Sequence, residues 1–466
     1  MRQLLLLPAL LALTPVAVSA EQFDTLFHGT GRVELSLSFS SVYALALLER
    51  PGGGMVVATA QSGLGCAGPE CPAVTFYSSG GTYQSGIGLT ATSFSAIFAA
   101  TMDSSGRVIM VGATPGMSNS NFQIVRLLPS GFLDTDFGSG GIATVDFFGQ
   151  EDVAYAVTVD KRDNVVVAGT AQTSKSAGNF AIARLRVSDG SLDSNFGLSG
   201  KVTIPFSLSA GYAVDRARAL AIDGAGRILI AGTSPDPAIN ADRVSLARLN
   251  SDGSADSSFC SPNCNFQGAY TAYHNGRRVY YFGNNTVHAD EVFGIDVRSD
   301  GGFYIVGDTY SGTFGTQKSS AIARFDVGGN YVTEALGTAP GFHGRFNGVR
   351  VADASGTRVI ASGANSTTVD DFEFGFTIQA FDANLTPLTG YGNCPTNTSA
   401  FCFAGNSATG NRTTSSGALN LDRLGRPLFA GSYRDNEIDD PVVGLVARIT
   451  NATGPRPDVI FRAGFH

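Results

Sequence analysis

Short apolar runs that end in a small residue recur seven times along the chain. They occupy residues 55–59 (MVVAT), 108–112 (VIMVG), 165–169 (VVVAG), 228–232 (ILIAG), 303–307 (FYIVG), 359–363 (VIASG) and 427–431 (PLFAG). Successive runs begin 53 to 75 residues apart. A repeat of this length is typical of chains built from small units that bury their apolar faces against one another.

One repeat is clearest in the third unit. Residues 153–160 (VAYAVTVD) predict a strand, a tight polar turn follows, and residues 165–169 predict the returning strand. Residues 180–186 (FAIARLR) predict a third strand and residues 201–206 a fourth. Helical spacing of apolar residues never persists beyond one turn. The unit is therefore expected to be a four-stranded antiparallel meander, which is too small to be stable alone.

Seven such units predict an all-β fold, namely a seven-bladed β-propeller of four-stranded antiparallel meanders. Residues 31–38 have the pattern of a fourth strand but precede any first strand, whereas the last unit (residues 415–449) lacks a clear fourth strand. We therefore expect the N-terminal strand to close the ring. An open β-solenoid is the alternative, and the complementary chain ends favour the propeller.

Two small residues of the repeat have packing interpretations. The glycine at the end of the second strand is expected where neighbouring blades approach too closely for a side chain. The connectors place Asp24, Asp134, Asp193 and Asp256 at equivalent positions. We expect these carboxylates to form Asx-turns, because one carboxylate per turn offers too few oxygens for the alternative role of a calcium ligand.

The N-terminus has the pattern of an export signal. Arg2 gives a positive start, residues 4–13 an apolar core and residues 18–20 (VSA) a cleavage site. A membrane anchor is the alternative, but Pro8 and Pro15 interrupt the short apolar stretch, and no span is expected after cleavage. We expect a signal peptide (residues 1–20), a propeller (21–450) and a C-terminal tail (451–466) in a protein exported to the periplasm, the cell surface or the medium.

Charge and glycine content exclude two further classes of protein. The net charge is −8 without a run of one sign, which argues against a nucleic-acid partner, since such partners are held by a basic face. The 58 glycines follow no collagen-like period. We expect a monomer.

The six cysteines form three local pairs: Cys66/Cys71, Cys260/Cys264 and Cys394/Cys402. In an exported chain such pairs predict loop-closing disulfides. A zinc site is the alternative, but it would require two distant pairs to come together as reduced thiolates.

The connector LD-x-x-F-G-x-x-G, followed by D-x-x-G-R, I-x-x-A-G-T and F-A-I-A-R-L, resembles the delta-60 repeat family of exported or surface bacterial proteins. The similarity is strongest over residues 133–200 and 192–255. It implies a propeller-like array and transfers no catalytic residue. The connector is replaced around residues 260–264 and 394–402. Residues 458–466 (DVIFRAGFH) also resemble a short ending of exported Gram-negative proteins, and a sorting peptide and an additional edge strand both remain open.

Two acidic loops follow the second strands of consecutive units. Their carboxylates are Asp370, Asp371, Glu373, Asp435, Glu437, Asp439 and Asp440. In a propeller these loops project from one face, where they would bind Ca²⁺ or a partner, or act as an acid/base pair. Solvated loops that keep the chain soluble are the favoured alternative.

The longest insertion gives a second candidate region, a ligand loop of aromatic and imidazole side chains. It contains Tyr273, His274, Tyr280, Tyr281 and His288. An elaborated blade edge is the alternative interpretation.

No catalytic constellation is present. The five histidines have no metal-ligand spacing, and there is no nucleophile elbow or phosphate loop. We therefore expect a non-catalytic, exported scaffold that binds a protein or a glycan at the cell envelope, without a cofactor other than Ca²⁺. A glycan-active hydrolase or lyase with a site on the loop-bearing face is the alternative.

Overall fold

The computed structural model describes the strands and most of the tight turns of the repeats. The described residues are 32–35, 41–62, 69–89, 92, 94–116, 119–206, 213–236, 241–261, 276–284, 289–311, 317–337, 343–353, 355–366, 374–388, 400–403, 413–421, 427–434 and 442–448. The predicted signal peptide and C-terminal tail lie outside this set. Among the described residues, no helix has the length and apolar character needed to cross a membrane.

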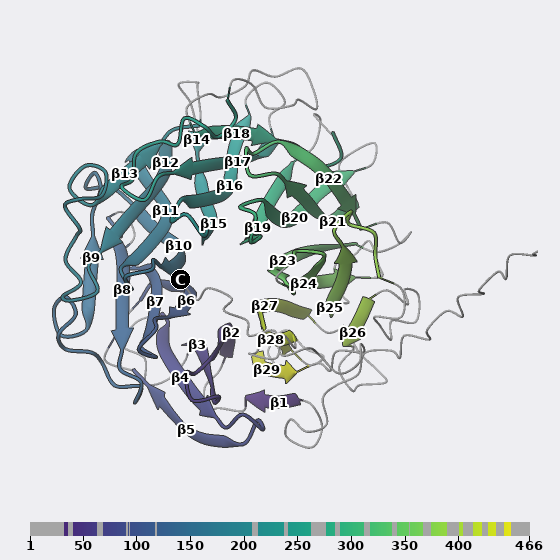
Figure 1. The fold of residues 1–466 in the computed structure, drawn as a ribbon. Helices are drawn as coiled ribbons and strands as arrows, with labels where there is room; N and C mark the ends of the chain where they lie inside the picture. Colours follow the sequence, from purple (N-terminus) through teal and green to yellow (C-terminus); the bar gives the residue numbers. More distant parts are fainter. Residues whose placement is uncertain are drawn as a thin grey trace, which may run out of the picture.

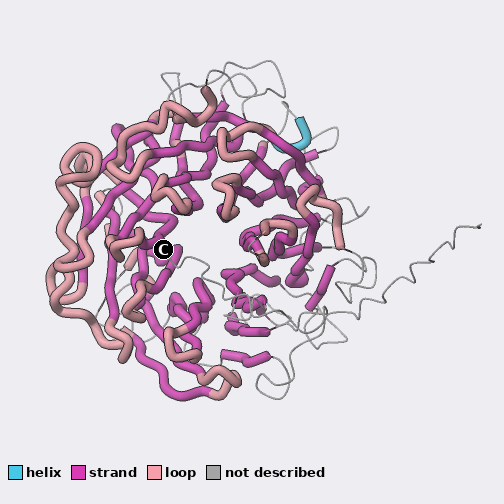
Figure 2. Tube along the Cα trace, viewed as in Figure 1, coloured by secondary structure: helices cyan, strands magenta, loops and turns pink. Residues whose placement is uncertain are grey.

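The molecule is an all-β propeller whose sheets are arranged around a common centre (Figure 1). Strands account for nearly all regular structure of the described residues, which also include the short helical turn η1 (Phe282–Asn284), drawn in cyan in Figure 2. Five sheets each contain one repeat unit, with the strands in sequence order from the centre outward.

The first two of these sheets follow one another in the chain. One contains β6 (Ala96–Met102), β7 (Val108–Ala113), β8 (Phe122–Leu127) and β9 (Ile142–Val145). The next contains β10 (Asp152–Val159), β11 (Val165–Ser174), β12 (Ala177–Leu185) and β13 (Lys201–Ile204), with β14 (Ala213–Val214) paired to β12.

The remaining three single-unit sheets have four strands each. The first of them contains β15 (Arg216–Ile222), β16 (Ile228–Asp236), β17 (Ala241–Leu249) and β18 (Arg277–Tyr280). The second contains β19 (Asp290–Val297), β20 (Phe303–Ser311), β21 (Gln317–Phe325) and β22 (Tyr331–Leu336). The third contains β23 (His343–Val351), β24 (Arg358–Ser366), β25 (Phe374–Asp382) and β26 (Ala400–Phe403).

The sixth sheet corrects the expected blade count. It has eight strands: β27 (Thr413–Leu421), β28 (Pro427–Arg434), β29 (Val442–Arg448), β2 (Ser41–Glu49), β3 (Met55–Ser62), β4 (Cys71–Tyr77) and β5 (Tyr83–Gly88), with β1 (Arg32–Leu35) paired to β29. The first and last units share this sheet because Ser41 of β2 pairs in parallel with Val442 of β29.

The prediction of seven blades is therefore wrong, because the described strands form six blades. Closure of the ring by the N-terminal strand is not confirmed. Strand β1 pairs with β29 in antiparallel register and extends the eight-stranded sheet. The predicted second and third strands of the repeat are confirmed in all seven units, because they coincide with β3, β7, β11, β16, β20, β24 and β28 and with β4, β8, β12, β17, β21, β25 and β29.

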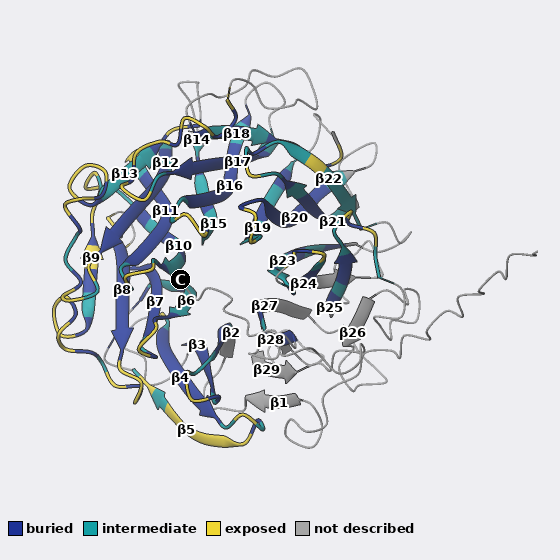
Figure 3. Ribbon diagram, in the orientation of Figure 1, coloured by how far each residue is buried: buried dark blue, intermediate teal, exposed yellow. Residues whose placement is uncertain are grey.

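The hydrophobic core lies between neighbouring sheets. One cluster joins Val111 and Ile124 of one blade to Val167 and Ala183 of the next. Another joins Leu246 to Ile305 across the following interface. The middle strands of the blades are accordingly the most buried (Figure 3). Burial of apolar surface between sheets thus holds units together that are not stable singly.

Candidate functional site

The innermost strand of each single-unit blade carries a β-bulge at the same position. The register with the second strand skips Phe98 in β6, Tyr155 in β10, Arg218 in β15, Phe293 in β19 and Asn347 in β23. In the eight-stranded sheet, β2 skips Leu45 in the same way. A bulge leaves one residue out of the hydrogen-bonded ladder and redirects its side chain. The six residues are named here the bulge positions.

The glycine of the second strand accommodates this bulge. Gly169 pairs with Ala154, immediately before the skipped residue, and a Cβ built on Gly169 would lie 2.0 Å from the carbonyl oxygen of Val153. The same relation holds at Gly232, where the carbonyl oxygen of Arg216 is 2.0 Å away. The crowding expected between blades therefore comes first from the blade's own inner strand. The preceding blade adds a smaller obstacle, since the Phe122 ring lies 2.9 Å from the Gly169 Cβ position.

Side chains at four bulge positions touch from one blade to the next. The rings of Phe98 and Tyr155 meet edge to face with centroids 4.8 Å apart. The Arg218 guanidinium carbon lies 5.2 Å from the Tyr155 ring centroid and 5.8 Å from that of Phe293. The Arg345 guanidinium carbon of the next blade is 5.1 Å from the same centroid. Phe98, Tyr155, Arg218, Phe293 and Arg345 are named here the inner belt.

The inner belt follows the strands nearest the centre of the propeller. Figure 1 shows β6, β10, β15, β19 and β23 as the innermost strands of consecutive blades. Phe98 is 42% exposed, and the other four belt side chains are partly exposed. The belt is therefore a solvent-accessible surface of aromatic rings and guanidinium groups.

Arg218 has no hydrogen-bond or ion-pair partner within the described part of the chain. Its Nε atom is fully buried and unpartnered. Its guanidinium instead rests between two aromatic faces, which stabilise a cation through the negative face of the ring. Arg218 interacts electrostatically with the carboxylate of Asp242, whose pKa is raised by burial despite the opposing effect of Arg216. Arg218 thus retains guanidinium donors for a ligand.

A second charged group lies at the beginning of β19 and the end of β20. Asp308 forms an ion pair of 2.9 Å with Lys318, and Glu291 faces Asp308 in the strand register. Burial raises the pKa of Asp308 to about 6, against the opposing effect of Lys318. Arg345 of the inner belt also interacts electrostatically with Asp308.

Other buried carboxylates hold the blades in place. Asp152, Asp215 and Asp290 stand at equivalent positions where an inner strand begins, and all three are fully buried. Each accepts a hydrogen bond from the backbone N–H of an aromatic residue that follows the preceding blade's last strand: Phe147 at 2.8 Å, Phe206 at 2.8 Å and Phe282 at 3.0 Å. Burial raises the pKa of Asp152 to about 7.

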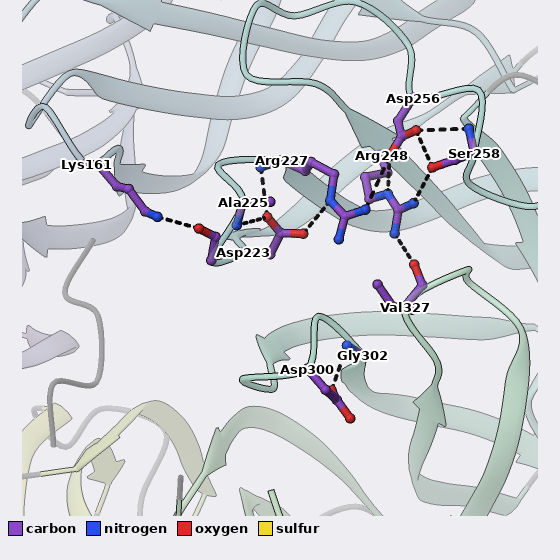
Figure 4. A network of polar contacts seen from close by, with 11 residues as sticks. Lys161, Asp223, Ala225, Arg227, Arg248, Asp256, Ser258, Asp300, Gly302 and Val327 are labelled. Carbon is purple, nitrogen blue, oxygen red and sulfur yellow. Dashed lines mark hydrogen bonds and ion pairs between the residues drawn. The ribbon is translucent and has the colours of Figure 1, made fainter. Parts of the chain in front are cut away.

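The connector carboxylates belong to a second scaffold motif (Figure 4). Asp256 accepts the Ser258 backbone N–H at 2.9 Å, which confirms the expected Asx-turn, and pairs with Arg248 at 2.7 Å. Arg248 also donates to the carbonyl oxygen of Val327 in the next blade and lies 4.7 Å from the centre of the Phe259 ring. The motif recurs in two other blades: Arg126 with Asp134 and Phe137, and Arg184 with Asp193 and Phe196. These carboxylates bind arginine, and Asp24 lies outside the described residues.

Most of the predicted site residues lie outside the described residues. These are the acidic-loop residues Asp370, Asp371, Glu373, Asp435, Glu437, Asp439 and Asp440, and the ligand-loop residues Tyr273, His274 and His288. Calcium binding by the acidic loops stays a prediction. Within the part of the chain that the structure describes, there is no cluster of side chains able to hold a metal ion.

Tyr280 and Tyr281 are the described members of the predicted ligand loop. Both are buried, and their hydroxyl groups donate to Glu334 and Asp236 respectively. Their hydroxyls are therefore engaged within the fold.

The predicted disulfides also stay predictions. Cys71 and Cys260 are buried, and neither is a free thiol. Their predicted partners Cys66 and Cys264 lie outside the described residues, as does Cys394, and Cys402 is described only as part of the backbone of β26.

The inner belt is not among the predicted site residues, although the sequence holds a signal for the bulges that form it. Every bulge position is followed by Ala or Gly, as in Tyr155-Ala156, Arg218-Ala219 and Phe293-Gly294. The bulge positions themselves share no chemical type, and so a search for matching residues does not find them.

Comparison with known proteins agrees with this fold. Residues 104–137, 163–196 and 226–259 match the family described as "Domain of unknown function (DUF5122) beta-propeller". The chain contains repeats of a beta-propeller family. Each matched segment ends at the phenylalanine of an Arg–Asp–Phe motif, namely Phe137, Phe196 or Phe259. A comparison with curated proteins finds no match.

Several solved structures are similar to this chain at very low sequence identity. The crystal structure of the polysaccharide lyase Uly1 is 8% identical with a TM-score of 0.53, over 89% of this chain and 90% of that one. Chaetomium thermophilum Sqt1, bound to the N-terminus of ribosomal protein L10, is 10% identical with a TM-score of 0.44, over 88% of this chain and 97% of that one. The NanB sialidase from Streptococcus pneumoniae is 10% identical with a TM-score of 0.39, over 90% of this chain and 69% of that one.

Proposed function

We propose that the protein is an exported, non-catalytic scaffold that binds a protein or a glycan of the cell envelope against the inner belt. The observation that carries the proposal is the continuous contact of Phe98, Tyr155, Arg218 and Phe293 across four blades. Binding sites combine apolar and aromatic walls with a few polar groups that orient the ligand. The belt has both elements, aromatic rings and guanidinium groups, on the innermost strands of neighbouring blades.

The inner strands suit this role because the blade scaffold does not use their bulge positions. Buried Asp152 and the Arg248–Asp256 pair join neighbouring blades through other residues. Side chains of the belt therefore supply binding while the scaffold motifs supply stability.

Titration calorimetry with a panel of soluble glycans and peptides tests the proposal. Tyr155→Ala is expected to weaken binding of any ligand found by about tenfold or more, since a stacked aromatic contributes roughly 1–3 kcal/mol when a ligand covers it. Phe132→Ala is the matched control, because Phe132 is 64% exposed and lies in a turn away from the belt. Equal loss of affinity in both variants, or none in Tyr155→Ala, would contradict the proposal.

A second candidate is cleavage of the bound glycan, and Asp308 favours it. Asp308, whose pKa burial raises to about 6, is itself fully buried, and Glu291, which faces it from the adjacent strand, is partly exposed. A glycan would therefore reach this acidic pair through Glu291, as general acid–base chemistry requires. Incubation with polysaccharides, followed by reducing-end and unsaturated-product assays, separates the two functions. Turnover that is lost in Glu291→Gln would support the enzyme.

A further inference from the structure

We infer that the ligand of the inner belt is a carboxylate-bearing saccharide, whose acid groups bind Arg218 and Arg345. The inference rests on the proposed function and adds the chemical class of the ligand. It begins from the two guanidinium groups that flank Phe293, at 5.8 Å and 5.1 Å from its ring centroid.

The charge of Arg218 favours an anionic ligand. Neither Arg218 nor Arg345 makes an ion pair within the described residues, in contrast to Arg126, Arg184 and Arg248, whose partners are within 2.8 Å. A guanidinium presents donors in a fork that matches a carboxylate. The neighbouring acids Asp242, Glu291 and Asp308 do not neutralise Arg218 by direct contact, since none of them forms an ion pair with it.

The alternation of rings and guanidinium groups favours a saccharide. Phe98, which is 42% exposed, offers an aromatic surface, and a pyranose ring presents a flat C–H face with polar groups at its edge. Next along the belt, guanidinium groups lie over the rings of Tyr155 and Phe293. The two guanidinium carbons are no farther apart than the sum of their distances to the Phe293 centroid, a span that one oligosaccharide crosses. Rings and carboxylates that repeat along a polyuronate match this surface.

The bulges disfavour an extended acidic peptide as the ligand. A peptide that binds an exposed strand edge does so by continuing the hydrogen-bond ladder. The inner strands interrupt their ladders at Tyr155, Arg218 and Phe293, and a bulged edge is poorly suited to such pairing.

Calorimetric titration of the purified full chain with matched polymers tests the inference. The probes are polygalacturonate, alginate and hyaluronate, each compared with the same polymer whose carboxyl groups are methyl-esterified. We expect at least one free acid to bind about tenfold or more tightly than its ester, because hydrogen bonds to charged groups contribute most of this difference. Arg218→Gln should remove that preference for the free acid over the ester. Arg345→Gln is the second variant, and Arg186→Gln is the control, because Arg186 is exposed at the opposite end of its blade.

Each outcome decides a different point. Equal affinity for acid and ester, or a preference that survives both Arg218→Gln and Arg345→Gln, overturns the carboxylate inference and leaves the proposed function intact. Binding of poly-glutamate without binding of any polysaccharide overturns the saccharide class. Absence of binding by every polymer overturns the inference, whereas insensitivity of all binding to Tyr155→Ala overturns the proposed function itself.

Discussion

The backbone carbonyl of Val153 occupies the space that a side chain on Gly169 would need. The carbonyl oxygen is 2.0 Å from the Cβ position, and the distance is set by the bulge that skips Tyr155. The small residue that marks each repeat is thus the partner of a bulge in the same blade. Thr59 at the equivalent position of β3 shows that one blade adjusts to a larger residue.

Replacement of this glycine should destabilise the fold. We expect Gly169→Ala to lower the free energy of unfolding by about 1–3 kcal/mol, the usual cost of forcing an atom into filled space. Urea denaturation followed by circular dichroism measures the change. Gly224→Ala is the control, because no atom lies within 4 Å of its Cβ position. Equal stability of the two variants would contradict this account of the bulge.

Loss of one charged partner in the Arg–Asp–Phe motif should lower the free energy of unfolding by more than Gly169→Ala does. The Arg248 side chain is 1% exposed and that of Asp256 8% exposed, so that Asp256→Ala leaves a buried cation without its carboxylate. We expect a loss of about 3 kcal/mol. In a double-mutant cycle, Arg248→Met combined with Asp256→Ala should be less damaging than the sum of the single changes. Simple additivity would show that the pair does not act as a unit.

Buried Asp152 should make the protein less stable as the pH rises from about 4 to 7. Burial raises its pKa in the folded state to about 7, so the folded state binds a proton that the unfolded state has released. Its Oδ1 atom has no partner among the described residues. For one proton, the free energy of unfolding changes by at most about 1.4 kcal/mol per pH unit.

Asp152→Asn should flatten this slope while retaining the hydrogen bond from the Phe147 N–H. Urea unfolding at pH 4.5, 5.5 and 7 measures it, with Asp136→Asn, an exposed carboxylate, as the control. A slope that is identical in wild type and Asp152→Asn would refute the assignment.

A tryptophan in the belt should report ligand binding directly. The chain has no tryptophan, so Phe98→Trp introduces a single tryptophan beside Tyr155, and its emission can be excited selectively. Because Phe98 is 42% exposed, the larger ring is accommodated. Ligand addition should shift the emission to shorter wavelength, whereas Phe132→Trp, in an exposed turn, should not respond. A response from Phe132→Trp alone would place the ligand elsewhere.

The repeat and its middle strands were predictable because their signal is local. Residues 165–169 and 180–186 are apolar at nearly every position, since they form strands covered on both faces by neighbouring blades. The Asx-turns of Asp193 and Asp256 were predictable for the same reason, because an aspartate bonds amides two residues away.

The blade count and the belt depend on contacts between distant residues. The bridge between Ser41 and Val442 joins the first unit to the last, and no local pattern encodes it. The bulge positions hold Leu45, Phe98, Tyr155, Arg218, Phe293 and Asn347, which differ in size and polarity. A ladder can skip a residue of any type, so the skipped residue itself has no characteristic composition.

Because the hydrogen-bond ladder tolerates any residue type at a bulge position, these positions can determine which ligand the protein binds. A skipped residue contributes no cross-strand pair, and the glycine opposite supports the backbone path whatever side chain the bulge carries. Six positions around the centre can therefore exchange leucine for arginine or tyrosine for asparagine without a change in the hydrogen-bonding plan. The backbone of the propeller thus stays the same while the side chains at the bulge positions differ. A substitution in one blade can therefore alter ligand specificity without a change in the other blades.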